Sequence, residues 1–295
     1  MGIKTASALR VISRRRIRRP NRSLEVDILM TMVLGAFGLF SAWPLIYVIN
    51  NAFKPLNEIF LFPPRLFVQN PTFNNFKDLF TIIGNSWIPF SRYIFNTVFI
   101  TTAGTLGTVF VGSMAAFPLA KYKFPGSKVM SSLIVYSLMF SSSVTAIPNY
   151  IIMSKLGMID SYWAVIIPAI GSTLGLYLMK NNIVQIPDSL LEASKMDGAS
   201  EFKIYFSIIM PLSKPAWITL IVLSFQSLWG TTGGTFIYAE KLKPVSYALS
   251  QIVSAGVART GVASAVSLIM LVVPVTVFII SQSNVIETMA TSGMK

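Results

Sequence analysis

Long apolar runs separated by short polar segments dominate the hydrophobic pattern of this chain. Each run approaches the roughly twenty residues that a helix needs to cross a bilayer. They lie at about 28–49, 94–117, 129–153, 162–180, 213–230 and 262–284. The fifth run is short and opens on Lys214 and Pro215, which a helix tolerates in its first turn because lysine can snorkel. The pattern predicts an all-α, polytopic membrane protein with six transmembrane helices.

The segment between the fourth and fifth runs is polar and carries helix signals of its own. Ser189 with Glu192 matches the S-x-x-E capping box that starts a helix. Gly198 can adopt the left-handed backbone angles that end a helix at low cost. We therefore expect a helix, a sharp turn at Gly198 and a second short helix that ends before Pro211.

Composition agrees with a membrane protein and removes several function classes. Hydrophobic residues make up 53% of the 295 residues and charged residues 12%, whereas about a quarter of a soluble domain is charged. The chain has no cysteine and no histidine, which excludes disulfides, thiol catalysis, zinc sites and histidine acid–base chemistry. We expect no catalytic residue and no metal site.

The sequence lacks two features that would let the chain power transport by itself: a nucleotide-binding motif and ionisable residues within the apolar runs. No G-x-x-x-x-G-K-[ST] motif occurs, and the nearest fragment, at 126–128, lacks the first glycine. No ionisable residue lies deep in any of the six runs, where ion-coupled carriers bind protons or sodium. Sodium sites built from backbone carbonyls at broken helices stay open, so an ion-coupled secondary carrier remains an alternative.

The positive charge is concentrated at one end of the chain and predicts the orientation in the membrane. Of 24 lysines and arginines, 16 fall on the side of the N-terminus and 8 on the other side, with the arginine cluster at 14–19 contributing most. Positively charged segments stay in the cytoplasm, so both termini are expected there. The net charge of +13 indicates contact with anionic lipid headgroups rather than nucleic acid. Glu25 and Asp27 interrupt the basic stretch, unlike a cleaved signal peptide, so the first helix should be retained.

The polar segment also carries a family resemblance. It reads E-A-S-x-x-D-G-A at 192–199 and I-I-M-P at 208–211, which resembles the EAA loop of permease subunits of bacterial ABC importers. Ser194 and Met210 depart from the usual alanine and leucine, but they keep small size and apolar character. The alternative interpretation is an ordinary amphipathic connector between two membrane helices.

This resemblance implies a type I ABC importer permease fold and a cytoplasmic coupling loop at 188–212. In that family the loop docks as a coupling helix into a cleft on the ATPase subunit. The residues expected to take part here are Glu192, Ala193, Ser194, Asp197, Gly198, Ala199 and Pro211.

A second resemblance lies in the segment between the first two runs. The patterns F-K-x-x-x-E-I at 53–59, P-P at 63–64 and P-T-x-x-N-F at 71–76 are similar to the first outer loop of the second permease in carbohydrate importers of the maltose type. Pro148 and the ending at 291–295 also fit that family. Gly230 departs from the asparagine that commonly follows Trp229. The resemblance covers nearly everything from residue 30 onward.

The two resemblances together imply a domain organisation and a set of partners. The expected parts are a basic cytoplasmic tail at 1–26, a first transmembrane helix at 27–50, an outer loop at 51–92, an importer core at 93–284 and a C-terminal tail at 285–295. The expected partners are a second related permease, two ATPase subunits, an extracytoplasmic sugar-binding protein and membrane lipids. No cofactor is expected in this chain, because ATP and magnesium would bind the ATPase.

The expected activity is ATP-driven import of a sugar, with an oligosaccharide as the favoured substrate, across the bacterial cell membrane. This chain would form half of the translocation pore. An ABC importer for a non-sugar solute would share the coupling loop and is the alternative.

Polar and aromatic side chains within the runs are the candidates for a sugar path. Aromatic faces stack on sugar rings and amides bond to hydroxyls, which selects Asn96, Asn149, Gln226 and Trp229. Each also has a structural explanation, because amides bond across neighbouring membrane helices and tryptophan favours the lipid interface. The Gly171-x-x-x-Gly175 motif is expected to allow close helix packing.

Overall fold

The computed structural model describes residues 24–63, 65–84, 88–254, 256 and 259–292 of the chain. Within these ranges the secondary structure is helical and no strand occurs. The all-α prediction is therefore confirmed. The arginine cluster at 14–19 and the last three residues lie outside the described residues, so the predictions for the basic tail and the chain ending rest on sequence alone.

The chain divides into two compact units, Met1–Tyr47 and Val48–Lys295. The described part of the first unit belongs to helix α1 (Leu24–Phe53), whose 30 residues contain Pro44. Glu25 and Asp27 lie in its first turn, where the partial positive charge of the helix N-terminus stabilises negatively charged side chains. Its apolar length matches the first predicted crossing.

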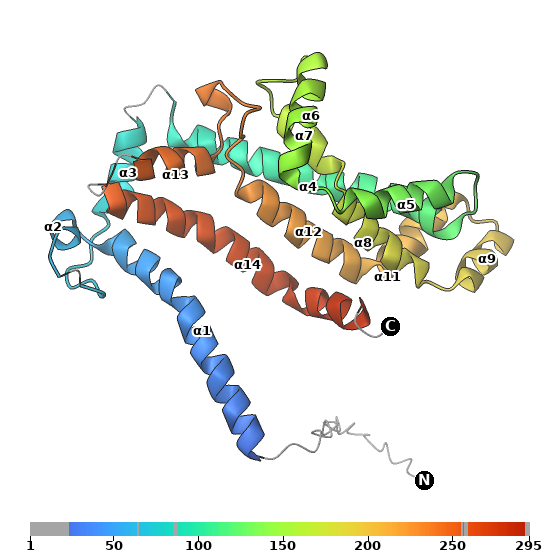
Figure 1. Cartoon of the computed structure of the whole chain (residues 1–295), viewed down its shortest axis with the longest axis horizontal. Helices are drawn as coiled ribbons and strands as arrows, with labels where there is room; N and C mark the ends of the chain where they lie inside the picture. The colour runs from blue at the N-terminus through green and yellow to red at the C-terminus, as the bar shows by residue number, and fades with distance from the viewer. Residues whose placement is uncertain (1–23, 64, 85–87, 255, 257–258, 293–295) are drawn as a thin grey trace, which may run out of the picture. The chain divides into compact units, whose positions relative to one another are not determined.

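Helix α4 (Phe90–Lys121) is the centre of the second unit (Figure 1). It packs against α7 (Trp163–Ile170), α8 (Thr173–Val184) and α12 (Lys214–Trp229). Helix α14 (Thr260–Ser292) lies along α12 and also contacts α3 (Asn74–Gly84) and α13 (Val245–Ser254). Most of the unit is thus connected through α4 and α12.

Small residues let the central helices approach closely. A Cβ atom on Gly175 of α8 would lie 2.8 Å from Leu220 Cδ1 of α12, and a Cβ on Gly112 of α4 would lie 3.9 Å from the Gly175 carbonyl carbon. At Gly171 a Cβ would meet only the backbone of its own helix, at 3.6 Å from the Pro168 oxygen. The packing role predicted for the glycine motif therefore belongs to Gly175 rather than to Gly171.

Four helical stretches in the described residues are long and apolar enough to cross a membrane: Glu25–Phe53, Phe90–Lys121, Trp163–Val184 and Thr260–Gln282. A fifth is formed if Glu201–Leu212 and Lys214–Trp229, which are bent by 77° relative to each other, count as one broken span. The remaining predicted run, 129–153, is two shorter helices, α5 (Ser127–Ser137) and α6 (Ser142–Lys155). Serines cluster at the break, and their hydroxyls compete with the helix for backbone hydrogen bonds.

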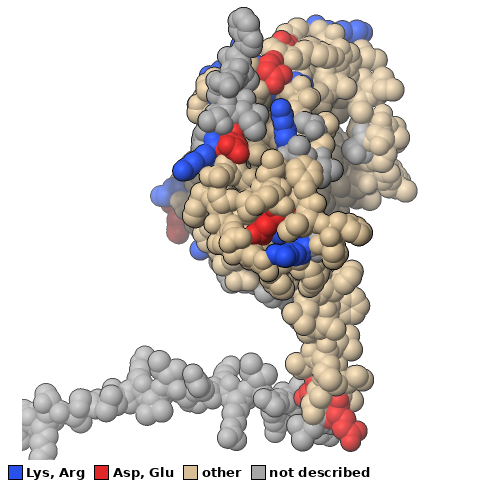
Figure 2. Space-filling model, turned by 90° about the vertical axis from the view of Figure 1, so that its left-hand side faces the viewer, with Lys and Arg blue, Asp and Glu red and all other residues tan. Residues whose placement is uncertain are grey.

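Short elements cover the end of the unit where α4 begins. These are α2 (Leu56–Ile59) and η2 (Glu240–Leu242), together with α3 and α13. Figure 2 looks toward this side of the molecule, and its few charged side chains, several of them in adjoining pairs of opposite sign, are set in an uncharged surface. The described residues on this face show no broad patch of one sign.

Candidate functional site

The polar segment between α8 and α12 folds into a helical loop. Its parts are α9 (Asp188–Met196), α10 (Glu201–Ile204), the π-helical stretch η1 (Tyr205–Ile209) and α11 (Met210–Leu212). Leu191 is the buried residue of α9, and the rest of that helix is exposed or half-buried. Among the residues predicted for coupling, Ser194 and Ala199 are half-buried, and the exposed ones are Glu192, Ala193, Asp197, Gly198 and Pro211.

The turn after α9 has the geometry expected of a glycine stop. Gly198 has φ +75°, and its N–H donates to the Lys195 carbonyl at 3.0 Å. The Ala199 N–H donates to the Ser194 carbonyl, five residues back, at 3.0 Å. This longer bond is typical of a Schellman motif. The predicted left-handed turn at Gly198 is confirmed.

The predicted capping box is wrong. Helix α9 begins at Asp188, one residue before Ser189, and its N-cap is Pro187, which makes no side-chain cap. The fixed φ of proline, here −61°, already favours a helix start. The capped helix is the next one, where Ser200 Oγ accepts the Lys203 N–H at 3.4 Å.

The second helix of the loop also runs further than predicted. It continues through Pro211 to Leu212 instead of ending before the proline. The turns before Pro211 widen into the π-helical stretch η1. Since proline has no N–H and its ring clashes with the preceding turn, a wider turn lets the helix pass it.

The last residue of α4, Lys121, joins three segments of the chain. Its ammonium donates to the carbonyls of Val184, at 3.4 Å, and of Ile186 at the end of α8. It also pairs with the Asp188 carboxylate at 2.8 Å, at the start of α9. The Lys121 side chain is only 4% exposed, whereas that of Asp188 is 73% exposed. A buried cation at a helix C-terminus is favourable when its donors are satisfied in this way.

The next residue, Tyr122, contacts the other end of α9. Its hydroxyl donates to the Glu201 carboxylate at the start of α10. Glu201 also pairs with Lys195 in the last turn of α9, at 2.9 Å, and the Lys195 ammonium lies 4.8 Å from the centre of the Tyr122 ring. The hydrogen bonds to Glu201 and then to Tyr122 raise the pKa of Lys195 above its usual value.

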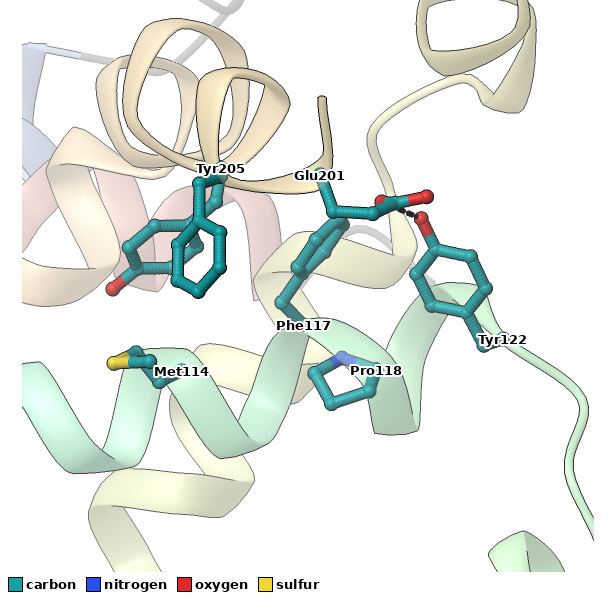
Figure 3. A pocket seen from close by; sticks show the side chains of 7 residues that line it. Met114, Phe117, Pro118, Tyr122, Glu201 and Tyr205 are labelled. Carbon is teal, nitrogen blue, oxygen red and sulfur yellow. Dashed lines mark hydrogen bonds between the residues drawn. The ribbon is translucent and has the colours of Figure 1, made fainter. Parts of the chain in front are cut away.

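A hollow of about 340 Å³ lies between α4 and the beginning of the second helix. Figure 3 shows Met114, Phe117 and Pro118 of α4 on one side, with Glu201 and Tyr205 opposite and the Tyr122–Glu201 hydrogen bond at the edge. The lining is mostly apolar side chains. Apolar packing between α4 and α10 is therefore incomplete where the polar contacts are made.

The second helix of the loop is anchored to both central helices. The Tyr205 and Ser113 hydroxyls lie 2.5 Å apart, which joins η1 to α4. The Trp217 indole N–H donates to the Met210 carbonyl at 3.0 Å, across the 77° bend into α12. Ile204 and Ile209 are fully buried between these contacts. The second helix of the loop is thus part of the hydrophobic core.

Asn96, predicted for the sugar path, is fully buried on α4 and has its amide satisfied by protein. Its Nδ2 donates to the carbonyls of Lys241, at 2.9 Å, and Lys243, at 2.8 Å. Its Oδ1 accepts the Tyr162 hydroxyl at 2.7 Å. In this structure Asn96 holds the η2 segment and the start of α7 against α4.

The other three path candidates lie apart from Asn96 along the chain and differ in exposure. Trp229 is half-buried, its indole N–H donates to the Met270 carbonyl of α14 at 2.9 Å, and its ring stacks on Phe225. Gln226 is exposed on α12, and Asn149 is half-buried on α6. Their predicted contact with a sugar stays a prediction.

A second hollow, of about 270 Å³, lies between α4, the break between α7 and α8, and α12. None of the four predicted path residues lines it. Four hydroxyl-bearing side chains do, together with apolar ones. They are Thr108, Ser172, Ser224 and Ser227. Isolated serines and threonines in apolar runs are common in membrane helices, so composition alone did not select them.

The charged residues of the F-K-x-x-x-E pattern point inward. Lys54 and Glu58 are each 4% exposed, and the Lys54 ammonium donates to the Arg65 carbonyl. The Glu58 carboxylate accepts the N–H groups of Gln69, at 3.1 Å, and Asn70, at 2.9 Å. The pattern therefore fixes the fold of the 51–76 segment.

Sequence reasoning missed Lys121 and Tyr122 as parts of the site. Lys121 was counted only as a positive charge in a connecting segment. Its position directly after a long apolar run is a usable signal, because a lysine there either snorkels to water or caps a helix end. The exposed Asp188 that binds it lies 67 residues away, which no local pattern reveals.

Comparison with protein families gives a match over residues 108–289, to the family described as binding-protein-dependent transport system inner membrane component. The matched region includes the whole of the loop Asp188–Leu212 together with the end of α4.

Two proteins of Bacillus subtilis are similar to this chain. The polygalacturonan/rhamnogalacturonan transport system permease protein YtcP is 31% identical over 229 residues, covering 77% of this chain and 78% of its own length. The galactooligosaccharides transport system permease protein GanQ is 28% identical over 279 residues, covering 92% of this chain and 96% of its own length.

A solved structure also has the same fold. One chain of a bacterial ABC transporter involved in the import of the acidic polysaccharide alginate superimposes with a TM-score of 0.77 at 22% identity. The superposition covers 90% of this chain and 99% of the other.

Proposed function

Because the chain belongs to the family of binding-protein-dependent transport system inner membrane components, we propose that it is the membrane-spanning subunit of an ATP-driven oligosaccharide importer. The chain is a multi-pass membrane protein, and its relatives are transport permeases. The names of YtcP and GanQ both refer to transport of oligomeric or polymeric sugars, which supports a carbohydrate substrate of more than one unit.

The observation that carries the coupling role is the accessibility of α9. It presents exposed Glu192 and Met196, the latter 88% exposed, while a single buried residue, Leu191, holds it to the core. Leu190, Phe202 and Phe206 of the same loop are exposed as well, and several exposed apolar side chains in one loop support a contact surface. We propose that α9 and the Gly198 turn form the surface to which an ATPase subunit binds from the cytoplasm.

The proposed mechanism is alternating access. Closure of an ATPase dimer on ATP moves α9, and the second unit of this chain moves with it against a related permease. A sugar-binding protein delivers the substrate on the outer side, where the 51–76 and 231–254 segments lie in the proposed orientation. ATP and magnesium bind to the ATPase, so this chain needs no cofactor of its own.

The decisive experiment uses the complete transporter reconstituted in vesicles. Glu192→Lys reverses a charge on the exposed face of α9 and is expected to abolish both sugar uptake and uptake-dependent ATP hydrolysis while insertion stays normal. Lys123→Glu reverses a charge in the exposed turn between α4 and α5 and is the control, expected to leave uptake and ATP hydrolysis unchanged. Normal uptake by Glu192→Lys would contradict the coupling role.

The partners are tested by mild-detergent purification of the tagged chain from its native membrane. Mass spectrometry is expected to find a second permease, an ATPase and a solute-binding protein. If the chain purifies without these partners, the proposed assembly is contradicted and an ion-coupled carrier becomes the favoured alternative.

A further inference from the structure

Two adjacent residues at the end of α4 hold both ends of α9. Lys121 binds Asp188, the first residue of the helix, at 2.8 Å. Tyr122 binds Glu201, which pairs with Lys195 in the last turn of the helix at 2.9 Å. Helix α9 is therefore attached at its start and at its end to one point of α4.

These polar contacts join α4 to the two ends of α9, while the helix that follows packs on α4 through apolar side chains such as Ile204 and Tyr205. From α9 only Leu191 is buried in the core, and on the α10 side the 340 Å³ hollow separates parts of the two surfaces. Figure 3 shows that Tyr122 and Glu201 close one edge of this hollow. A displacement of α9 therefore has a direct polar route to α4 through the side chains of residues 121 and 122, beside the apolar contact of Leu191 with the core.

The connection at Lys121 is stiff for a physical reason. Its side chain is 4% exposed, and a buried ammonium that loses its acceptors is strongly disfavoured. The same ammonium binds carbonyls at the end of α8. When Asp188 moves, Lys121 and the ends of both α4 and α8 are expected to move with it.

Helix α4 is also the element through which such a movement would spread. It packs against α7, α8 and α12, the central helices of the unit, and it is a continuous helix of 32 residues from Phe90 to Lys121. A displacement of Lys121 would reach these contacts along the helix, past Pro118 in its last turn.

We propose that Lys121 and Tyr122 are positioning residues that convert a displacement of α9 into a rigid-body movement of α4. The inference rests on the proposed coupling function. It adds that the transmitting residues lie outside the loop itself, on the connecting segment between the second and third apolar runs.

The test measures uptake and ATP hydrolysis together in the reconstituted transporter. Lys121→Met removes the ammonium and keeps an apolar stem, and Tyr122→Phe removes only the hydroxyl. Each variant is expected to assemble with the ATPase and to retain stimulated hydrolysis. The number of ATP molecules hydrolysed per sugar imported should rise by roughly tenfold in the double variant, in line with the loss of charge-assisted hydrogen bonds.

Matched controls come from the same region. Lys123→Met removes an exposed lysine two residues away, and Tyr136→Phe removes an exposed tyrosine hydroxyl of α5; both should keep the wild-type ratio. Lys121→Arg keeps a cation with several donors and should restore much of the coupling.

Two results would overturn the inference. An unchanged ratio in the double variant means that these residues transmit nothing. A parallel fall of uptake, hydrolysis and ATPase binding means that they only support the fold of the loop. Glu192→Lys separates this inference from the proposed function, because normal uptake in that variant contradicts the coupling role whatever the two α4 variants do.

Discussion

The hydroxyl of Tyr162 donates a 2.7 Å hydrogen bond to Oδ1 of Asn96, 66 positions earlier in the chain. Together with the two hydrogen bonds from Asn96 Nδ2 to the carbonyls of Lys241 and Lys243, this bond satisfies a fully buried amide. Three segments far apart in the sequence thus meet at one side chain.

Asn96→Ala is expected to destabilise the protein rather than to change its affinity for substrate alone. The substitution leaves the Lys243 carbonyl without its side-chain partner and removes one of two partners from the Lys241 carbonyl and the Tyr162 hydroxyl, which Arg92 also contacts, at a cost of about 1–3 kcal/mol. Thermal unfolding of the purified transporter in detergent measures the loss. Asn149→Ala, at a half-buried position of α6, is the control and should unfold near the wild-type temperature. A wild-type unfolding temperature in Asn96→Ala would contradict the structural role and favour the sugar path.

The Glu58 carboxylate gives the 51–76 segment a predictable dependence on pH. The Gln69 N–H, with further help from Asn70, holds the pKa of Glu58 below its usual value of 4.5 despite desolvation. A carboxyl with a depressed folded-state pKa stabilises the fold above its unfolded pKa. That contribution is lost as the pH falls through the folded value.

Hydrogen exchange at the amides of Gln69 and Asn70 measures this dependence. Protection factors, corrected for intrinsic exchange, should be high at neutral pH and decline below the usual pKa of a glutamate. Glu58→Gln should show low protection at every pH. Equal protection at acid and neutral pH in the wild type would show that the carboxylate does not hold the segment.

Much of the fold was predictable because apolar length and turn chemistry are local properties. The long runs predicted α1, α4, the α7–α8 pair and α14, and the glycine at 198 predicted the turn after α9. The failures have local causes too. The 129–153 run breaks between Ser137 and Ser142, and serine favours caps and turns over helix interiors, a preference that hydropathy does not count.

The candidate site was predictable only where it has a sequence pattern. The E-A-S-x-x-D-G-A stretch identified the exposed helix, but its attachment through Lys121 and Tyr122 depends on contacts across 67 and 79 positions. Likewise, Lys54 and Glu58 were visible as a pattern, yet only the structure shows that they point inward. Single sequences report local order well and side-chain direction poorly.

Gly198→Ala is expected to strain the backbone without any clash. A Cβ at this position meets nothing within 4 Å, so the cost comes from φ +75° alone, and left-handed angles cost a non-glycine residue about 1–2 kcal/mol. Uptake by the reconstituted transporter should fall modestly for alanine and be abolished for Gly198→Pro. The proline also loses the N–H that binds the Lys195 carbonyl.

Gly157→Ala is the matched control, since Gly157 has φ +66° and equally open surroundings at the end of α6. It should carry a similar strain with little effect on uptake. If both alanine variants reduce uptake equally, the Gly198 turn has no special role in transport.

Gly175→Val tests the close packing of the central helices. The new side chain would push Leu220 of α12, whose Cδ1 lies 2.8 Å from the position of the added Cβ. Overpacking of this kind costs about 1–3 kcal/mol. Thermal unfolding should therefore occur at a lower temperature. Gly171→Ala is the control, because its Cβ would make only ordinary contacts; equal losses in both variants would argue against a packing role specific to Gly175.

Trp217→Phe tests the bend between α11 and α12. The indole N–H satisfies the Met210 carbonyl at 3.0 Å, on the far side of Ser213, where the two helices turn by 77°. Phenylalanine keeps an aromatic ring but cannot donate, so the carbonyl loses its side-chain partner at a cost of about 1 kcal/mol. Because the bend connects the loop to α12, the variant should lower the unfolding temperature and also reduce uptake. Trp163→Phe, at a tryptophan that is 53% exposed, should change neither quantity. A normal unfolding temperature combined with reduced uptake would instead mean that the indole acts during transport and not in holding the resting bend.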